Sequence, residues 1–396
     1  MKTNSNLKKI VIVAIFFIFA FVVSTSFPQK NFLVLAEENN LSFLDATENS
    51  ISYAKSMVVL EPESGRILYQ KNCNEKLPMA STTKIMTAYV ALKHAKNLDE
   101  KFVVDVSSVG VEGTSLYLRK GEVKTLRELL YGLMLPSGND AAVAIACHIS
   151  GTEEEFVKLM NQEAQNLGLK NTNFANAHGL DKEGHYTSAY DLAKITAKAM
   201  ENEIFREIAA TKNIKVSGNE EVAAKLLKNK NKLLWSMEGC EGVKTGYTDN
   251  ARRCFVASAK RNGMRLICVV LNCGPMFEEA ERFLNLAFDN YKMYNLLSSY
   301  SPNRNVLVEN GEKEEVETLT RRHFSLPLTS QEYQKIEYNV NLPSKIEAPV
   351  EKEQELGTLE IKLNENVLFE EKIYSQTEIK STKFLSKVEE IVNQWN

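Results

Sequence analysis

The sequence predicts an α+β protein, in which an antiparallel sheet flanked by helices is followed by a small all-β domain. Three observations support this: strand-like runs near both ends of residues 51–296, helical apolar spacing between them, and strand-rich sequence after about residue 297. Hydrophobic residues make up 44% of the 396 and charged residues 25%, as in a globular protein that buries a core. The net charge of −3 and the lack of a dense Lys/Arg run argue against a nucleic-acid partner.

The first residues have the pattern of an export signal. Three lysines precede an apolar run over residues 10–23, and small or apolar residues follow at 34–36. We therefore expect a signal peptide over residues 1–36, a polar flexible segment over 37–50, and an extracytoplasmic location, secreted or on the outer face of the cytoplasmic membrane. The alternative is an uncleaved anchor, which needs about 20 apolar residues.

The main domain, 51–296, contains two hairpin signals. Residues 56–60 and 66–70 are β-type runs around a turn at 61–65, and a later pair of strands turns at Asn262-Gly263. The strands expected there are 243–247, 254–260 and 264–271. Apolar residues at helical spacing predict helices that begin near residue 81 and at 126–135, 141–149, 153–167, 189–201 and 278–297.

The C-terminal region changes character twice. Residues 297–375 are rich in Val, Leu, Ile and Glu, with turn signals at Asn310-Gly311 and 364–366, and predict the β domain. For residues 376–396 we expect an amphipathic helix, whose stripe is Phe384, Leu385, Val388, Ile391, Val392 and Trp395. A lone terminal helix has to bury such a stripe, and the β domain is one surface on which it can dock.

Six cysteines in an exported chain permit disulfides. A two-residue turn at Asn262-Gly263 would place residue 254 opposite 271, which leaves Cys273 diagonal to Cys254 and too far for a bridge. Cys147 lies in an apolar helical run. We therefore expect most of the cysteines to be buried free thiols.

The first chemical motif is Ser81-Thr-Thr-Lys84. Positions i and i+3 share a helix face, so the lysine amine can reach the serine hydroxyl and remove its proton. A helix N-terminus also offers backbone N–H groups to a developing oxyanion. The motif alone is weak evidence, because Ser5-Asn-Leu-Lys8 matches it within the predicted signal peptide.

Two further triplets follow. Ser137-Gly138-Asn139 joins two apolar helices, where a hydroxyl and an amide can be held rigidly, whereas its copy at 217–219 lies in a polar stretch. Lys244-Thr245-Gly246 offers a cation and a hydroxyl to a carboxylate, beside a glycine that permits close approach of a ligand.

The order Ser-x-x-Lys, Ser-x-Asn, Lys-Thr-Gly is typical of β-lactamases and penicillin-binding proteins. The surrounding sequence resembles the low-molecular-mass penicillin-binding D-alanyl-D-alanine carboxypeptidases over nearly all of the chain after about residue 50. The segments that resemble the family are PMASTTKIMTAYVAL, LMLPSGNDAAVAIA, FANAHGLDKEGHYTSAYDLA, GVKTGYTDNARRCFVASA and, in the β-rich C-terminal domain, APVEKEQELGTLEI. The resemblance implies a β-lactamase/transpeptidase-like fold with a helical subdomain. It also implies that the C-terminal helix contacts a membrane surface, as the alternative to docking on the β domain.

The resemblance also implies a reaction: a serine D,D-carboxypeptidase that removes the terminal D-alanine from peptidoglycan stem peptides, takes part in cell-wall biogenesis and binds β-lactam antibiotics covalently. Ser81 would be acylated, with Lys84 as general base and Ser137 as proton relay to the leaving D-alanine. Asn139 would bond the substrate amide. The remaining substrate contacts would be Lys244 and Thr245 to the terminal carboxylate, Gly246 beside them, and the backbone N–H of Tyr247, which with that of Ser81 forms the oxyanion hole.

The chain departs from the family at two places. Ala251-Arg252-Arg253 stands where members often carry Ala-Gly-aromatic, and lysines stand in 229–233 where many carry an arginine, so carboxylate recognition can differ. His178 and His185 lack an H-E-x-x-H or Cys/His cluster, so we expect neither metal nor cofactor and read them as residues that bridge backbone. The rival functions are peptidoglycan endopeptidase or transpeptidase, serine β-lactamase, and a non-catalytic penicillin sensor. No convincing Glu-x-x-Leu-Asn pattern favours a β-lactamase.

Overall fold

The computed structural model describes residues 52–216, 224–299, 304–383, 388 and 391–392. The predicted signal peptide (1–36) and the flexible segment (37–50) lie outside these residues. So do the Ser-Gly-Asn copy at 217–219 and three members of the predicted C-terminal stripe, Phe384, Leu385 and Trp395.

A five-stranded antiparallel sheet with the order β2-β1-β9-β8-β7 forms the frame of the first part. Both predicted hairpins are confirmed: β1 pairs with β2, and β8 pairs with β9 so that Arg261 faces Met264 across Asn262-Gly263. Both turn residues have positive φ, +48° and +85°, as a two-residue hairpin turn requires. The strands are β1 (Ser56–Leu60), β2 (Ile67–Lys71), β7 (Cys240–Thr248), β8 (Arg252–Arg261) and β9 (Met264–Leu271).

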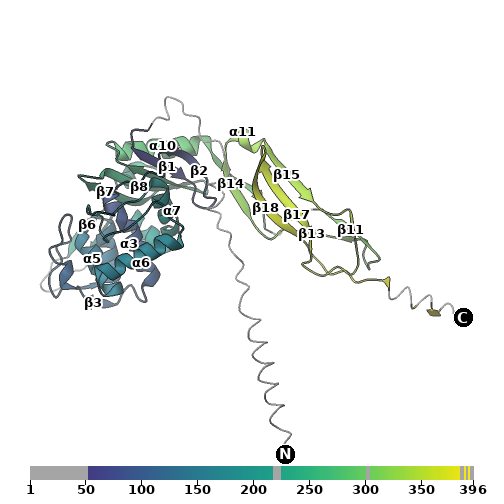
Figure 1. Cartoon of the computed structure of the whole chain (residues 1–396), viewed down its shortest axis with the longest axis horizontal. Helices are drawn as coiled ribbons and strands as arrows, with labels where there is room; N and C mark the ends of the chain where they lie inside the picture. Colours follow the sequence, from purple (N-terminus) through teal and green to yellow (C-terminus); the bar gives the residue numbers. More distant parts are fainter. Residues whose placement is uncertain (1–51, 217–223, 300–303, 384–387, 389–390, 393–396) are drawn as a thin grey trace, which may run out of the picture.

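The two faces of the sheet are buried under different helices (Figure 1). Alternate residues of a strand point to opposite faces, so Val269 packs among the residues of the helical subdomain while Val270 packs on α10 (Met276–Asn290). α7 (Ala189–Ala199) packs on β9 and β1 on the first face. This two-sided burial explains why β8 and β9 read as nearly continuous apolar runs.

The helical subdomain lies on one face of the sheet and surrounds α3 (Lys84–His94), which follows the 3₁₀ turn η3 (Ala80–Thr83). Side-chain caps begin several of its helices: the Thr125 hydroxyl accepts a hydrogen bond from the Glu128 N–H, and Thr152 and Ser188 do the same for their helices. The other elements are α4 (Leu126–Met134), α5 (Asn139–Ser150), α6 (Glu153–Asn166), α8 (Glu203–Ala210), α9 (Leu233–Ser236), η4 (Val106–Ser108), β3 (Lys101–Val103), β4 (Val123–Thr125), β5 (Asn213–Val216) and β6 (Lys225–Lys228).

The predicted helix 278–297 is wrong at its end. α10 stops at Asn290, and residues 292–297 form β10 (Lys292–Leu297), which pairs with β14 (Phe324–Leu328) of the C-terminal region. The apolar residues of KMYNLL fit a helix as well as a strand, and only pairing with β14 decides between them. The β-rich region therefore begins near residue 292 rather than at 297.

Between residues 292 and 381, the described part of the chain forms strands and one short helix, α11 (Ser330–Tyr333). Its hairpin of β17 and β18 places Leu363 opposite Asn366, which confirms the predicted turn at 364–366. Its sheets have the orders β10-β14, β12-β11-β16 and β13-β18-β17-β15. The strands not yet given are β11 (Val306–Glu309), β12 (Glu315–Val316), β13 (Thr318–Leu319), β15 (Ile336–Asn341), β16 (Lys345–Glu347), β17 (Glu355–Leu363) and β18 (Asn366–Ser375).

The predicted C-terminal helix begins later than residue 376. Ile379 is buried and pairs with Val350, and Ser381 pairs with Gly311, so this stretch belongs to the β region. The first helical residue described is Lys383. Three members of the predicted stripe are described, and all are exposed: Val388 (40%), Ile391 (56%) and Val392 (54%).

A buried arginine connects the two parts of the chain. Arg66, next to β2, donates to the carbonyl of Pro327 on β14 and to the carboxylate of Glu332 on α11. All six cysteines are free thiols, as expected for most of them. Of the helices in the described ranges, none is both long and apolar enough to span a membrane.

Candidate active site

The Ser-x-x-Lys motif spans the junction between the 3₁₀ turn η3 and α3. Ser81 is the second residue of the turn and Lys84 is the first residue of α3. The i, i+3 spacing brings the Lys84 Nζ to 2.9 Å from the Ser81 Oγ. The helix expected near Ser81 thus begins as a 3₁₀ turn, in which residues i and i+3 eclipse each other.

The Lys84 amine is held by two fixed acceptors besides the serine. Its Nζ donates to the Asn139 Oδ1 at 2.7 Å and to the His178 carbonyl at 2.5 Å. A neutral amine has two N–H bonds and one lone pair. With both N–H groups directed at these acceptors, the lone pair is directed at the Ser81 hydroxyl, which is the geometry needed to remove its proton.

Burial lowers the pKa of Lys84 well below its ordinary value, and the nearby Lys244 and Lys230 ammonium groups lower this pKa further. Asp140 acts in the opposite direction and raises the pKa of Lys84. Burial, with Lys230 again contributing, lowers the pKa of Lys244 to about 7. Desolvation thus makes Lys84 available as a neutral base, and the other two lysines of the site, Lys244 and Lys230, suit an anionic ligand.

Ser137 lies in the tight loop between α4 and α5, in the left-handed region at φ +74°. Such a conformation is uncommon for a non-glycine residue and costs about 1–3 kcal/mol. The side chain is 3% exposed, and its hydroxyl has no hydrogen-bond partner among the described residues. A strained serine with an unpaired buried hydroxyl is typical of a functional position.

β7 is an edge strand, and it carries the Lys-Thr-Gly triplet along one side of the site. A Cβ on Gly246 would lie 3.0 Å from the Ser81 backbone nitrogen, so the strand passes directly beside the motif serine. Lys244 is buried and donates to the Thr245 carbonyl at 2.9 Å. Tyr247 is exposed, with its hydroxyl bonded to Asp249. Half of an edge strand's backbone groups are free for a ligand.

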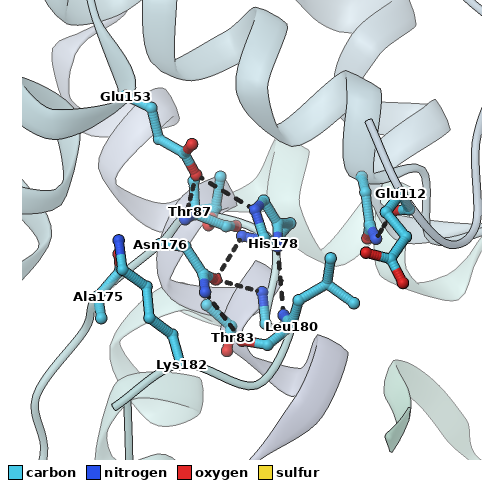
Figure 2. A network of polar contacts seen from close by, with 12 residues as sticks. Thr83, Thr87, Glu112, Glu153, Ala175, Asn176, His178, Leu180 and Lys182 are labelled. Carbon is cyan, nitrogen blue, oxygen red and sulfur yellow. Dashed lines mark hydrogen bonds and ion pairs between the residues drawn. The ribbon is translucent and has the colours of Figure 1, made fainter. Parts of the chain in front are cut away.

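The loop 175–185 forms another wall of the site (Figure 2). Asn176 accepts hydrogen bonds from the backbone N–H groups of His178 and Gly179 and donates to the Leu180 carbonyl. Gly179 has φ +94°, and a Cβ there would lie 2.0 Å from the Ala80 carbonyl oxygen. Only glycine lets this loop pass so close to the peptide that precedes Ser81.

Each of the two histidines of this loop accepts a hydrogen bond from a backbone N–H group of the same loop. His185 Nδ1 accepts from the Ala175 N–H while its Nε2 bonds the Thr83 hydroxyl, and His178 Nδ1 accepts from the Leu180 N–H. Burial lowers the pKa of His178 to about 3 and that of His185 to about 4, so both are neutral at physiological pH.

The structure adds a wall that the motifs did not reveal, the loop 112–118. Asn139 donates from its Nδ2 to the Glu112 carbonyl at 2.7 Å and from its backbone N–H to the Thr114 carbonyl at 2.7 Å. The Lys230 Nζ lies 3.3 Å from the Thr114 hydroxyl. A lysine of the segment 229–233, where many family members carry an arginine, therefore borders the site. The one sequence signal for this wall was Asp140, which follows Asn139 and bonds the loop.

Comparison with known proteins agrees with this geometry. The family described as D-alanyl-D-alanine carboxypeptidase matches residues 44–274, more than half of the chain, and the family described as penicillin-binding protein 5, C-terminal domain, matches residues 291–381. The chain belongs to the D-alanyl-D-alanine carboxypeptidase family. It is a low-molecular-mass penicillin-binding protein with a serine carboxypeptidase fold, which confirms the resemblance seen in the sequence.

Relatives of this carboxypeptidase match along most of their length. The D-alanyl-D-alanine carboxypeptidase DacF of Bacillus subtilis is 36% identical over 350 residues, which cover 86% of this chain and 90% of the relative. DacA of Escherichia coli K12 is 32% identical over 352 residues, with 85% and 86% covered.

Solved structures confirm the predicted fold class. Penicillin-binding protein 5 of Haemophilus influenzae superposes with a TM-score of 0.70 at 29% identity, over 84% of this carboxypeptidase and 98% of that chain. The DD-transpeptidase of Streptomyces K15 superposes with a TM-score of 0.58 at 34% identity, over 60% of this chain and 99% of that one. The α+β class and the following all-β domain are therefore both confirmed.

Proposed function

We propose that this carboxypeptidase cleaves the terminal D-alanine from peptidoglycan stem peptides through an acyl-enzyme on Ser81, with Lys84 as the base. The observation that carries the proposal is the buried Lys84 amine, which lies 2.9 Å from the Ser81 hydroxyl and is oriented by Asn139 and His178. Proton transfer to Lys84 makes Ser81 a nucleophile toward the penultimate D-alanine carbonyl.

The other site residues receive roles by position. The backbone N–H groups of Ser81 and Tyr247 hold the oxyanion, since β7 passes Ser81 at Gly246. Ser137, whose hydroxyl lacks a partner in the described chain, relays the proton to the departing D-alanine amine. The Asn139 side-chain amide has a further N–H and a further oxygen lone pair beyond its contacts with Glu112 and Lys84, and with these it bonds the substrate peptide.

The terminal carboxylate is held by the Lys244 ammonium and the Thr245 hydroxyl at the edge of the sheet. Its negative charge stabilises the buried ammonium group of Lys244, whose pKa is lowered to about 7 when the site holds no anion. Water then attacks the acyl-enzyme and releases the shortened peptide. β-Lactams enter the same site as covalent inhibitors, because they present a carboxylate and a strained carbonyl in a similar relation.

Intact-mass analysis after incubation with a penicillin tests this assignment. One penicilloyl adduct should form and map to Ser81 by peptide mapping, and Ser81→Ala should abolish both the adduct and D-alanine release. An adduct on Ser137, or labelling that survives Ser81→Ala, would contradict the assignment. Rapid turnover of penicillin without a lasting adduct would favour the β-lactamase alternative.

A second candidate reaction is transpeptidation, in which an amine of another stem peptide attacks the acyl-enzyme in place of water. The observation that favours it is the 34% identity to the Streptomyces K15 DD-transpeptidase, a protein that this chain covers almost completely. Mass analysis of products formed from a D-Ala-D-Ala peptide with a second amine-bearing peptide separates the reactions. The cross-linked product should remain minor compared with free D-alanine.

We also propose that residues 1–36 direct export. The C-terminal helix then contacts the outer face of the cytoplasmic membrane. The exposed Val388, Ile391 and Val392 support contact outside the protein rather than docking on the β domain. Glu389 and Glu390 offset the nearby lysines, so attachment should be weak and sensitive to salt.

A version that ends at Ser381 tests the membrane proposal by co-sedimentation with anionic lipid vesicles. The mature protein should sediment with vesicles at low salt and be released at high salt, while the truncated version should stay in solution under both conditions. Equal behaviour of the two versions, with lower thermal stability after truncation, would show that the helix packs on the protein instead.

A further inference from the structure

Asp140 is a buried aspartate beside the catalytic machinery for which the family motifs give no role. It is the second residue of α5 and is 1% exposed. Its carboxylate accepts four hydrogen bonds: one from the Ser115 hydroxyl at 2.7 Å, and three from backbone N–H groups, of Leu116 at 2.9 Å, Leu118 at 3.0 Å and Ala141 at 2.9 Å. Three of the four donors belong to the loop 112–118.

The loop that Asp140 holds is in direct contact with Asn139. The Glu112 carbonyl accepts from the Asn139 Nδ2, and the Thr114 carbonyl accepts from the Asn139 backbone N–H. A Cβ on Gly113 would lie 2.7 Å from the same Nδ2, so the loop backbone lies directly against the amide. The orientation of the Asn139 amide therefore depends on where the loop sits.

The Asn139 amide in turn orients the base. Its Oδ1 accepts from the Lys84 Nζ at 2.7 Å only while its Nδ2 faces the Glu112 carbonyl, because an amide turned by 180° would present its N–H groups to the lysine. We propose that Asp140 is a positioning residue of this active site, which fixes the loop 112–118 against Asn139 and so holds the Asn139 amide in the orientation that serves Lys84 and the substrate. This inference rests on the proposed function of Lys84 and Asn139.

Asp140 has a second effect, which gives the role a measurable signature. Its charge raises the pKa of Lys84, against burial and the two lysine ammonium groups. The ionisable groups around the amine are Lys244 on β7, Lys230 after β6, Asp140 on α5, and His178 and His185 of the loop 175–185, of which both histidines are neutral above about pH 4. Asp140 is thus the anion whose removal should move the titration of the base.

Three variants separate the positioning role from a general loss of stability. Asp140→Asn removes the charge and leaves the Leu116 and Leu118 N–H groups with one acceptor oxygen between them. Ser115→Ala removes the hydrogen bond from the Ser115 hydroxyl to Asp140, together with the one that this hydroxyl accepts from the Tyr117 N–H, and keeps the charge of Asp140. Asp191→Asn is the matched control, since Asp191 is also a buried aspartate in the first turn of a helix (α7) and holds a different loop through the Asn171 N–H and the Thr172 hydroxyl.

The measurement is the second-order rate constant for acylation by a penicillin from pH 5 to 9, together with kcat and KM for a peptide ending in D-Ala-D-Ala. For Asp140→Asn we expect acylation to fall by about 10-fold or more, the effect of losing hydrogen bonds to a charged group. The acid limb of the pH–rate profile should move to lower pH, since Lys84 without the Asp140 charge gives up its proton more easily. For Ser115→Ala we expect KM to rise severalfold and the acid limb of the profile to stay in place.

Asp191→Asn should lower the melting temperature and change neither the limb nor KM. The positioning role is refuted if folded Asp140→Asn keeps the rate and the acid limb of the unchanged protein, or if Asp191→Asn reproduces its kinetic effects. Should Asp140→Asn fail to fold, an unchanged KM in Ser115→Ala refutes the role and a raised KM supports it. Absence of a penicillin adduct on Ser81 in the unchanged protein would instead refute the proposed function.

Discussion

Replacement of the buried Lys244 by methionine should make the protein more stable and less active. Lys244 is almost fully buried, and its pKa falls from the ordinary 10.5 to about 7. A folded-state pKa below the unfolded value means that the unfolded chain holds this proton more tightly, so the group destabilises the fold at neutral and acid pH. At about 1.4 kcal/mol per pKa unit the cost is about 4 kcal/mol at pH 7, where the folded-state group is half protonated, and approaches about 5 kcal/mol at lower pH.

Methionine keeps a chain of similar length without the charge. The Thr245 carbonyl loses its Lys244 donor, which costs about 1–2 kcal/mol, so the expected net gain at pH 7 is about 2 kcal/mol. Stability of the unchanged protein should rise between pH 7 and 10.5, as the unfolded chain gives up its extra proton, and the gain of Lys244→Met should shrink across this window. Acylation by penicillin should fall about 10- to 100-fold, because the carboxylate loses its cation.

The assay is urea unfolding at pH 6, 7, 8 and 9, with penicillin acylation measured on the same samples. Lys158→Met provides the control, because the side chain of Lys158 is 71% exposed and pairs with Glu155 on the helix surface. That variant should show no pH-dependent change in stability. Lower stability of Lys244→Met at pH 7, by an amount that does not vary with pH, would refute the reasoning that burial of the ammonium opposes folding.

Two further predictions concern the serine and its surroundings. Lys84→Arg keeps the charge but cannot accept a proton at neutral pH, so acylation should fall at least about 100-fold, and near-normal acylation would show that another group is the base. Gly179→Ala places a Cβ 2.0 Å from the Ala80 carbonyl, so it should lower the free energy of unfolding by at least about 2 kcal/mol and slow acylation at Ser81. Gly184→Ala shares a positive φ, +77°, but meets only a side chain at 3.6 Å; thermal unfolding and acylation should therefore be affected less, and equal losses in the two variants would contradict the steric argument.

The reaction class could be predicted from the sequence because its chemistry lies in short local patterns. The i, i+3 spacing alone places Lys84 beside Ser81, and the Asn262-Gly263 turn alone sets the register of β8 and β9. Each motif, however, either had a second copy in the sequence or also fitted a non-catalytic role. Its assignment therefore depended on the order of the motifs and on the resemblance of the flanking segments to the family. The family match then confirmed the enzyme class.

Local patterns failed where one sequence fits two structures. The spacing of the apolar residues in 292–297 fits a helix as well as a strand. The segment forms the strand β10 because it pairs with β14, some 30 residues later in the chain. The stretch 376–381 likewise looked like the beginning of a helix until Ile379 was found paired with Val350 and buried. Pairing between distant segments is absent from any local window, so both boundaries required the fold.

The residue pattern alone predicts which side chains are the candidates for the chemistry, since the identity and spacing of Ser81, Lys84 and the two later triplets are features of the sequence. The protonation of those side chains depends on the fold. The pKa of Lys84 depends on burial and on Lys244, Lys230 and Asp140, residues that lie 56 to 160 positions away in the sequence. Desolvation and Coulomb interactions depend on distance in space rather than along the chain, and for that reason the contacts of Asp140 with the loop 112–118 became visible only once the chain was folded.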